Sequence, residues 1–249
     1  MNKLFENWRR YLEEEQLEEK LVLKKGKTGW WKYSQLVAEA YLTAPDMSGD
    51  QNLIALYEEL GRWLEKAVGR IETRTQVTSV DYHPYDSAKA LRQKVDDEGE
   101  MKVSTADAEH PIWKGEQGLK WNTAFRAWHD YQSHYARKTA FSLQGEFKSY
   151  NNHANMLPNR FVPALFTEVV GQISCFYQNG KNNCPQKAVI LDDFDFFNVG
   201  LLSEKGRQRI WADGNRYRAD TDKNSPTFKL LIPIQDKTDS EIENDSNNL

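Results

Sequence analysis

Apolar residues recur at helical spacing through the first third of the chain. Residues 3–23 place leucine and aromatic side chains three and four positions apart among charged ones, which predicts an amphipathic helix. Residues 30–42 and 52–71 repeat the pattern, and the turn-rich segment APDMSGD (44–50) separates them. We therefore predict three helices here, the first of which packs on the body of the protein or on a partner.

The pattern changes between residues 73 and 104. Residues 73–82 alternate polar and β-branched positions, residues 101–104 read as a shorter strand, and residues 87–95 keep helical spacing. These features predict two strands with a helix between them, and at most a small sheet.

Helical signals return after residue 122. Asn122 or Thr123 is suited to cap a helix that runs to about residue 138, and a second helix is predicted over 142–156. A third begins near a proline and covers 163–180, and the segment KLLIPI (229–234) is strand-like.

Together these elements predict a mainly α fold, a helical bundle with an N-terminal helical extension and at most a small β-sheet. We expect the amphipathic helix within residues 1–28 and a single mainly helical domain over 29–235. Residues 236–249 (DKTDSEIENDSNNL) are polar and acidic without aromatic residues, which predicts a disordered tail.

Composition narrows the class of protein. Hydrophobic residues make up 39% and charged residues 28%, which is typical of folded soluble proteins, and a net charge of -4 gives no field that would attract nucleic acid. No apolar run reaches the roughly 18 residues of a membrane span, and no signal peptide is seen, so we expect a cytoplasmic protein without a membrane partner. Cys175 and Cys184 are predicted to be free thiols, because two cysteines in these contexts fit neither a multi-bridge scaffold nor a thiolate zinc pair.

Residues with metal-binding chemistry gather between positions 110 and 172. His110, His129 and His134 are three of the five histidines in the chain, and Asp130 lies among them. On an α-helix Asp130 and His134 share a face about 6 Å apart, and His129 is displaced by one step of about 100°. Imidazole and carboxylate groups suit zinc, iron, manganese or nickel.

The next two predicted helices add further polar pairs. Glu146 and His153 are seven residues apart and nearly aligned, with Tyr150 between them. Glu168 and Gln172 interrupt an apolar run, where an unpaired carboxylate would cost several kcal/mol. Three such pairs facing one point would form a metal centre inside a bundle.

The same residues allow a second interpretation. Asp130 could pair with Arg126, Glu146 could cap its own helix, and the histidines could be ordinary buried groups, because buried polar groups need partners whether or not they are catalytic. Trp8, Trp63 and Trp128 fall at helical spacing with other apolar residues, which favours core positions. The pair Trp30 and Trp31, after the basic run KKGK (24–27), is the one place that invites a test of contact with a partner or nucleic acid.

Seven short segments between residues 38 and 200 form a combination that looks specific. They are AYLTAP (40–45), KVST (102–105), HPIW (110–113), FRAWHDYQSH (125–134), GEFKSYNNHA (145–154), PALFTEVVGQ (163–172) and QKA (186–188). In these segments the chain resembles a family of largely uncharacterised bacteriophage and mobile-element proteins. The resemblance implies a viral or mobile-element origin and one shared polar site, and it carries no assigned activity.

Two weaker likenesses concern enzymes. His129 and Asp130, with His110 upstream, resemble the HD phosphohydrolases, helical metalloenzymes that hydrolyse nucleotides. His110 precedes the pair by only 19 residues, closer than is usual there, and Glu146 or Glu168 replaces the distal aspartate. The chain is also similar to helical dinuclear-iron oxidases, which draw carboxylates and histidines from several helices. The residues that carry this likeness are Asp130, His134, Glu146, His153 and Glu168.

The leading hypothesis is a phage-encoded, metal-dependent hydrolase that acts on a phosphorylated small molecule such as a nucleotide. In it Glu146 or Glu168 serves as general base, and Arg126 or Lys148 neutralises phosphate charge. A divalent metal would lower the pKa of a bound water toward about 7. The candidate ligands are His110, His129, Asp130, His134 and His153.

Two alternatives belong to other classes. The first is a non-enzymatic phage structural or host-interaction protein that binds a host or virion partner through its N-terminal helix and Trp30 and Trp31. The second is a dinuclear-iron oxidase. Bound metal would favour an enzyme, and a metal-free protein that co-purifies with one partner would favour the interaction protein.

Overall fold

The computed structural model describes residues 28–180, 183–203, 205–206, 217–219 and 231–233. The predicted N-terminal helix (3–23) and acidic tail (236–249) lie outside these residues. Within them the chain is mainly helical and has two small two-stranded sheets, so the predicted mainly α class is confirmed. Among the described residues, no helix combines the length and apolar character that a membrane crossing requires.

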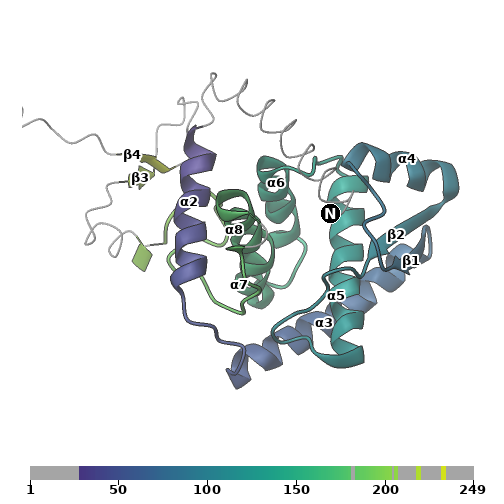
Figure 1. The fold of residues 1–249 in the computed structure, drawn as a ribbon, viewed down its shortest axis with the longest axis horizontal. Helices are drawn as coiled ribbons and strands as arrows, with labels where there is room; N and C mark the ends of the chain where they lie inside the picture. Colours follow the sequence, from purple (N-terminus) through teal and green to yellow (C-terminus); the bar gives the residue numbers. More distant parts are fainter. Residues whose placement is uncertain (1–27, 181–182, 204, 207–216, 220–230, 234–249) are drawn as a thin grey trace, which may run out of the picture.

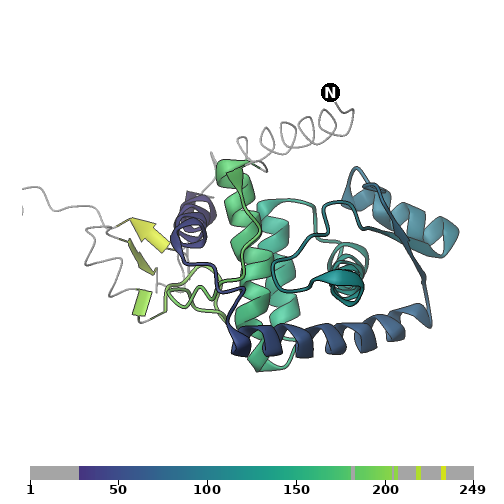
Figure 2. The ribbon, with the colours of Figure 1, turned by 60° about the horizontal axis from the view of Figure 1, so that its bottom comes forward.

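The helices form two groups that share one core. In one group α2 (Thr28–Thr43) and α6 (Leu143–Ala154) lie beside the helical run of α7 (Val162–Phe166), η3 (Thr167–Gly171) and α8 (Gln172–Asn179) (Figure 1). In the other, α3 (Gln51–Glu72) packs along α5 (Gly115–His129), and α3 also passes beneath the first group (Figure 2). A continuous cluster of buried apolar side chains joins both groups.

The first two described helices match the prediction. Asp50 begins α3 by accepting hydrogen bonds from the backbone N–H groups of Asn52 and Leu53, and the apolar face of α3 is buried. In α2, Trp30 and Trp31 are half-buried and pack against the core, where the ring of Trp30 contacts Phe147 at a centroid distance of 5.3 Å.

The predicted strands and their intervening helix form one unit. Strands β1 (Gln76–Val80) and β2 (Glu100–Ser104) pair in parallel, with Gln76 opposite Glu100, and α4 (Ala88–Glu98) is the crossover that a parallel pair requires. Gly99 ends α4 at a φ of 67°, a left-handed conformation that favours glycine. This unit packs against α5 and the turn that follows it.

Helix α5 begins earlier than the sequence suggested. The prediction that Asn122 or Thr123 caps this helix is wrong, because α5 starts at Gly115 and Asn122 is buried inside it, donating to the carbonyl of Ala108. After His129 the helix widens into a π-helical turn, η1 (Asp130–Tyr135), rather than continuing as an α-helix.

The last predicted helix also contains a π-turn. Its run from Val162 to Asn179 is interrupted by η3, in which the N–H of Gln172 bonds to the carbonyl of Thr167. Cys175 in α8 forms a disulfide with Cys184, so the prediction of two free thiols is wrong. Strand β4 (Leu231–Pro233) lies within the predicted strand and pairs antiparallel with β3 (Tyr217–Ala219).

Candidate metal centre

Four side chains from α5, η1 and α6 form what we call the histidine–glutamate cluster: His129, His134, Glu146 and His153. His129 is the last residue of α5 and His134 lies in η1, while Glu146 and His153 lie in α6. The sequence predicted each of them as a site residue, and the structure brings these four together.

The π-turn sets the relative position of His129 and His134. In an α-helix residues five apart point in different directions, but in η1 the backbone bonds run from residue i to i+5, as between the N–H of Ala136 and the carbonyl of Tyr131. The wider turn brings both imidazoles to the same side, with their Nε2 atoms 3.0 Å apart.

Two local features fix the start of α6 just before Glu146. The hydroxyl of Ser142 accepts from the N–H of Gly145 and caps the helix. Gly145 lies so close to Ala140 that a Cβ would be 2.0 Å from the Ala140 carbonyl oxygen. Glu146 therefore sits in the first helical turn, where the helix dipole favours a negative charge.

Three ligand groups converge at the spacing of a metal site. Nε2 of His129 lies 3.1 Å from Oε2 of Glu146, and Nε2 of His134 lies 3.3 Å from Oε1 of Glu146. Because zinc binds such atoms at about 2.0–2.2 Å, neighbouring ligands around an ion lie roughly 3 to 3.5 Å apart. The three separations, including the 3.0 Å between the imidazoles, fall in this range.

The second nitrogen of His134 is fixed by the backbone. Nδ1 of His134 lies 3.1 Å from the carbonyl oxygen of Thr139, which can only accept, so Nδ1 carries the proton. In the neutral ring Nε2 then presents its lone pair to the point of convergence. Metal-binding histidines are commonly held by such a bond from the other nitrogen.

His153 forms its hydrogen bond in the cluster with His129 rather than with Glu146. Nε2 of His153 lies 3.1 Å from Nδ1 of His129 and 3.0 Å from the hydroxyl of Ser133. Its ring packs on Trp128 at a centroid distance of 4.1 Å. When Nδ1 of His129 donates to His153, Nε2 of His129 also presents a lone pair to the cluster.

The charges in the cluster are strongly coupled. Burial opposes the positive charge of His134, but the Glu146 carboxylate, together with Asp130 and the Thr139 carbonyl, outweighs burial and raises the pKa of His134 above its ordinary value. Burial likewise opposes the charge of Glu146, but His134 and His129 lower the pKa of Glu146 well below its usual range. Burial and the neighbouring His129 keep His153 neutral by lowering its pKa.

Asp130 lies beside this cluster. One ligand atom each of His129, Asp130 and His134 lie within 4.8 Å of one another, the candidate metal-holding group among the described residues. Burial raises the pKa of Asp130, and the two histidines partly offset this effect. The side chains of His129 and Glu146 are 14% and 11% exposed, compared with 1% for His134, so the cluster is reached from the His129 and Glu146 side.

His110 and Glu168 form a second buried pair. Nδ1 of His110 accepts from the N–H groups of Ile112 and Trp113, so Nε2 carries the proton and donates to Oε1 of Glu168 at 3.2 Å. The hydroxyl of Tyr57 donates to the same oxygen at 2.6 Å. Both nitrogens of His110 are thus engaged, and this arrangement offers no lone pair to a metal.

The two predicted phosphate-binding cations lie in different settings. The guanidinium of Arg126 donates to the backbone carbonyls of Ser104, Ala106 and Asp107. Lys148 is exposed on α6. Sequence reasoning missed Ser133, Thr139 and Tyr57, since a hydroxyl in an ordinary helical or loop context carries no signal of a contact far along the chain.

No protein-family model, no curated protein and no solved structure matches the chain. The chemistry of the site is therefore inferred from its own geometry.

Proposed function

We propose that this protein is a metal-dependent hydrolase of a phosphorylated small molecule, with a divalent ion held by His129, His134 and Glu146. The observation that carries the proposal is the convergence of two imidazole nitrogens and one carboxylate at 3.0–3.3 Å. The carbonyl of Thr139 orients the ring of His134 through its Nδ1 atom, and His153 orients the ring of His129 in the same way.

A divalent ion there would lower the pKa of a coordinated water toward about 7 and so supply a nucleophile at neutral pH. Asp130 is the neighbouring group suited to take up a proton, because burial raises its pKa toward the range in which a general base works best. This differs from the expected roles of Glu146 as base and His110 as ligand.

A nucleotide substrate, a phage origin and a cytoplasmic setting in the bacterial host belong to the same proposal. A Cys175–Cys184 disulfide found in protein isolated directly from cells would argue against the cytoplasm, since disulfides persist mainly in oxidising compartments.

Elemental analysis and calorimetric titration with Zn²⁺ and Mn²⁺ test the metal site. We expect close to one ion per chain in the wild type and loss of binding in Glu146→Gln and His134→Gln. Glu116→Gln is a matched control, because Glu116 occupies the first turn of α5 but is exposed and pairs with Lys120. Hydrolysis of a panel of phosphomonoesters and nucleotides should then require the ion.

Two results would overturn the proposal. The first is a wild-type protein that binds neither ion after chelator treatment and dialysis. The second is metal binding that survives in both ligand variants, since the ion would then lie elsewhere.

A further inference from the structure

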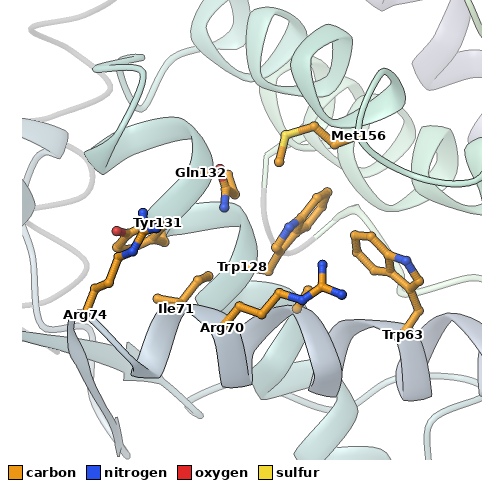
Figure 3. Close-up of a pocket in the computed structure, with 9 residues that line it drawn as sticks. Trp63, Arg70, Ile71, Arg74, Trp128, Tyr131, Gln132 and Met156 are labelled. Carbon is orange, nitrogen blue, oxygen red and sulfur yellow. The ribbon is translucent and has the colours of Figure 1, made fainter.

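A pocket of about 260 Å³ opens between α3 and the junction of α5 with η1. Its aromatic lining comes from Trp63 of α3, Trp128 of α5 and Tyr131 of η1. Trp63 and Trp128 pack edge to face with centroids 5.5 Å apart, and in Figure 3 Trp128 lies between Tyr131 and Trp63. Met156 lies across from α3 in the same view. Aromatic and thioether groups of this kind stack well on a planar ring.

The same pocket is lined by two cations and no described acidic side chain. Arg70 lies in the last turn of α3, Arg74 lies two residues beyond its end, and both are exposed. Neither guanidinium has an ion-pair or hydrogen-bond partner among the residues that the structure describes. In Figure 3 the Arg70 guanidinium lies between the two indole groups, and Arg74 lies near Tyr131. Guanidinium groups bind phosphate by paired hydrogen bonds.

We propose that this pocket binds a mononucleotide-like ligand, with its planar ring on Trp63 beside Trp128 and its phosphate on Arg70 and Arg74. The volume is slightly below the roughly 300–1,000 Å³ of typical ligand sites. The ring therefore fills the enclosed part, and the phosphate stays at the open side, where the arginines are exposed.

The pocket is distinct from the histidine–glutamate cluster. Trp128 lines the pocket and also packs on His153, so its ring is a wall that the two sites share. None of the converging ligand atoms of His129, His134 and Glu146 belongs to a residue that lines the pocket. Ligand binding here requires no metal, and the inference stands without the proposed hydrolase activity.

Calorimetry of the full chain in the presence of EDTA tests the pocket, with AMP, adenosine and inorganic phosphate as probes. We expect AMP to bind, adenosine to bind at least about tenfold more weakly, and phosphate alone to show no binding at the same concentration. The double variant Arg70→Gln, Arg74→Gln should reduce AMP affinity to the level of adenosine. Lys66→Gln is the matched control, because Lys66 is exposed on α3 but does not line the pocket.

A second variant tests the stacking surface. Trp63→Leu should weaken AMP and adenosine alike, because it removes a ring face and leaves both arginines in place. The proposal fails if AMP does not bind, if the double arginine variant binds AMP as the wild type does, or if inorganic phosphate binds as tightly as AMP. Glu146→Gln should leave AMP binding unchanged, so failure of the metal site and failure of this pocket are separate results.

Discussion

Glu168 holds a buried network whose loss should destabilise the fold without affecting the metal. Its Oε1 accepts from the hydroxyl of Tyr57 at 2.6 Å and from Nε2–H of His110 at 3.2 Å, and its Oε2 accepts from the side-chain amide of Gln172. The side chains of His110 and Glu168 are 2% and 4% exposed, so water cannot replace a missing partner. Glu168→Ala therefore leaves two buried donors without an acceptor.

The expected cost follows from these contacts. A buried donor left unsatisfied costs about 1–3 kcal/mol, so two such donors cost about 2–6 kcal/mol. We expect the free energy of unfolding to fall by about 2–6 kcal/mol. At about 2–4 °C for each kcal/mol in a domain of this size, Tm should fall by about 4–24 °C.

Urea unfolding followed by tryptophan fluorescence measures the change, with Zn²⁺ titration of the folded variant beside it. Glu109→Ala is the control, since Glu109 is exposed and adjoins His110 in the chain, and its effect should stay within about 0.5 kcal/mol. A Glu168→Ala protein with wild-type stability would refute the argument. So would a stable variant that no longer binds metal, because Glu168 would then belong to the metal site.

Two further substitutions test the start of α6 and the packing of α5. Ser142→Ala removes the cap of α6 and should lower the free energy of unfolding by about 1 kcal/mol in urea titration, and a change below 0.3 kcal/mol would mean that the cap is not needed. Gly118→Ala places a Cβ 2.1 Å from the carbonyl carbon of Trp113, so the backbone must shift and stability should fall by about 1–3 kcal/mol. Nuclear magnetic resonance of the imidazole protons should show His110 displaced in that variant, and an unchanged His110 signal at wild-type stability would contradict the predicted clash.

The sequence predicted most elements because their signals are local. The buried face of α3 follows helical spacing, and the cap at Asp50 and the left-handed Gly99 mark boundaries through their own backbone chemistry. The start of α5 was missed because Asn122 is a residue type that favours helix caps, yet here its amide is used to hold the carbonyl of Ala108. Whether an asparagine caps a helix or lies inside one depends here on a partner far along the chain, and a single sequence does not show that contact.

The candidate site shows the same division between local and long-range information. The sequence predicted that these residues meet at one site, but it did not show which of them converge, because helical spacing aligns Asp130 with His134. The structure keeps Asp130 near His134 and, through η1, also brings His129 to His134 and joins both histidines to Glu146. The pairing of His110 with Glu168 depends on Tyr57 in α3, which no spacing rule connects to either residue.

Two π-turns, η1 and η3, occur among the residues that the structure describes, and they hold their polar groups in different ways. In η3 the carboxylate of Glu168 meets donors from Tyr57, His110 and Gln172, so its hydrogen-bonding capacity is used within the fold. In η1 the turn directs two imidazole nitrogens toward a third ligand, and the bonds that fix the rings lie behind them. π-Turns are frequent at functional sites, but the turn alone does not identify one. What separates the two is the direction of the lone pairs, which is why we assign the metal to η1 and a structural role to η3.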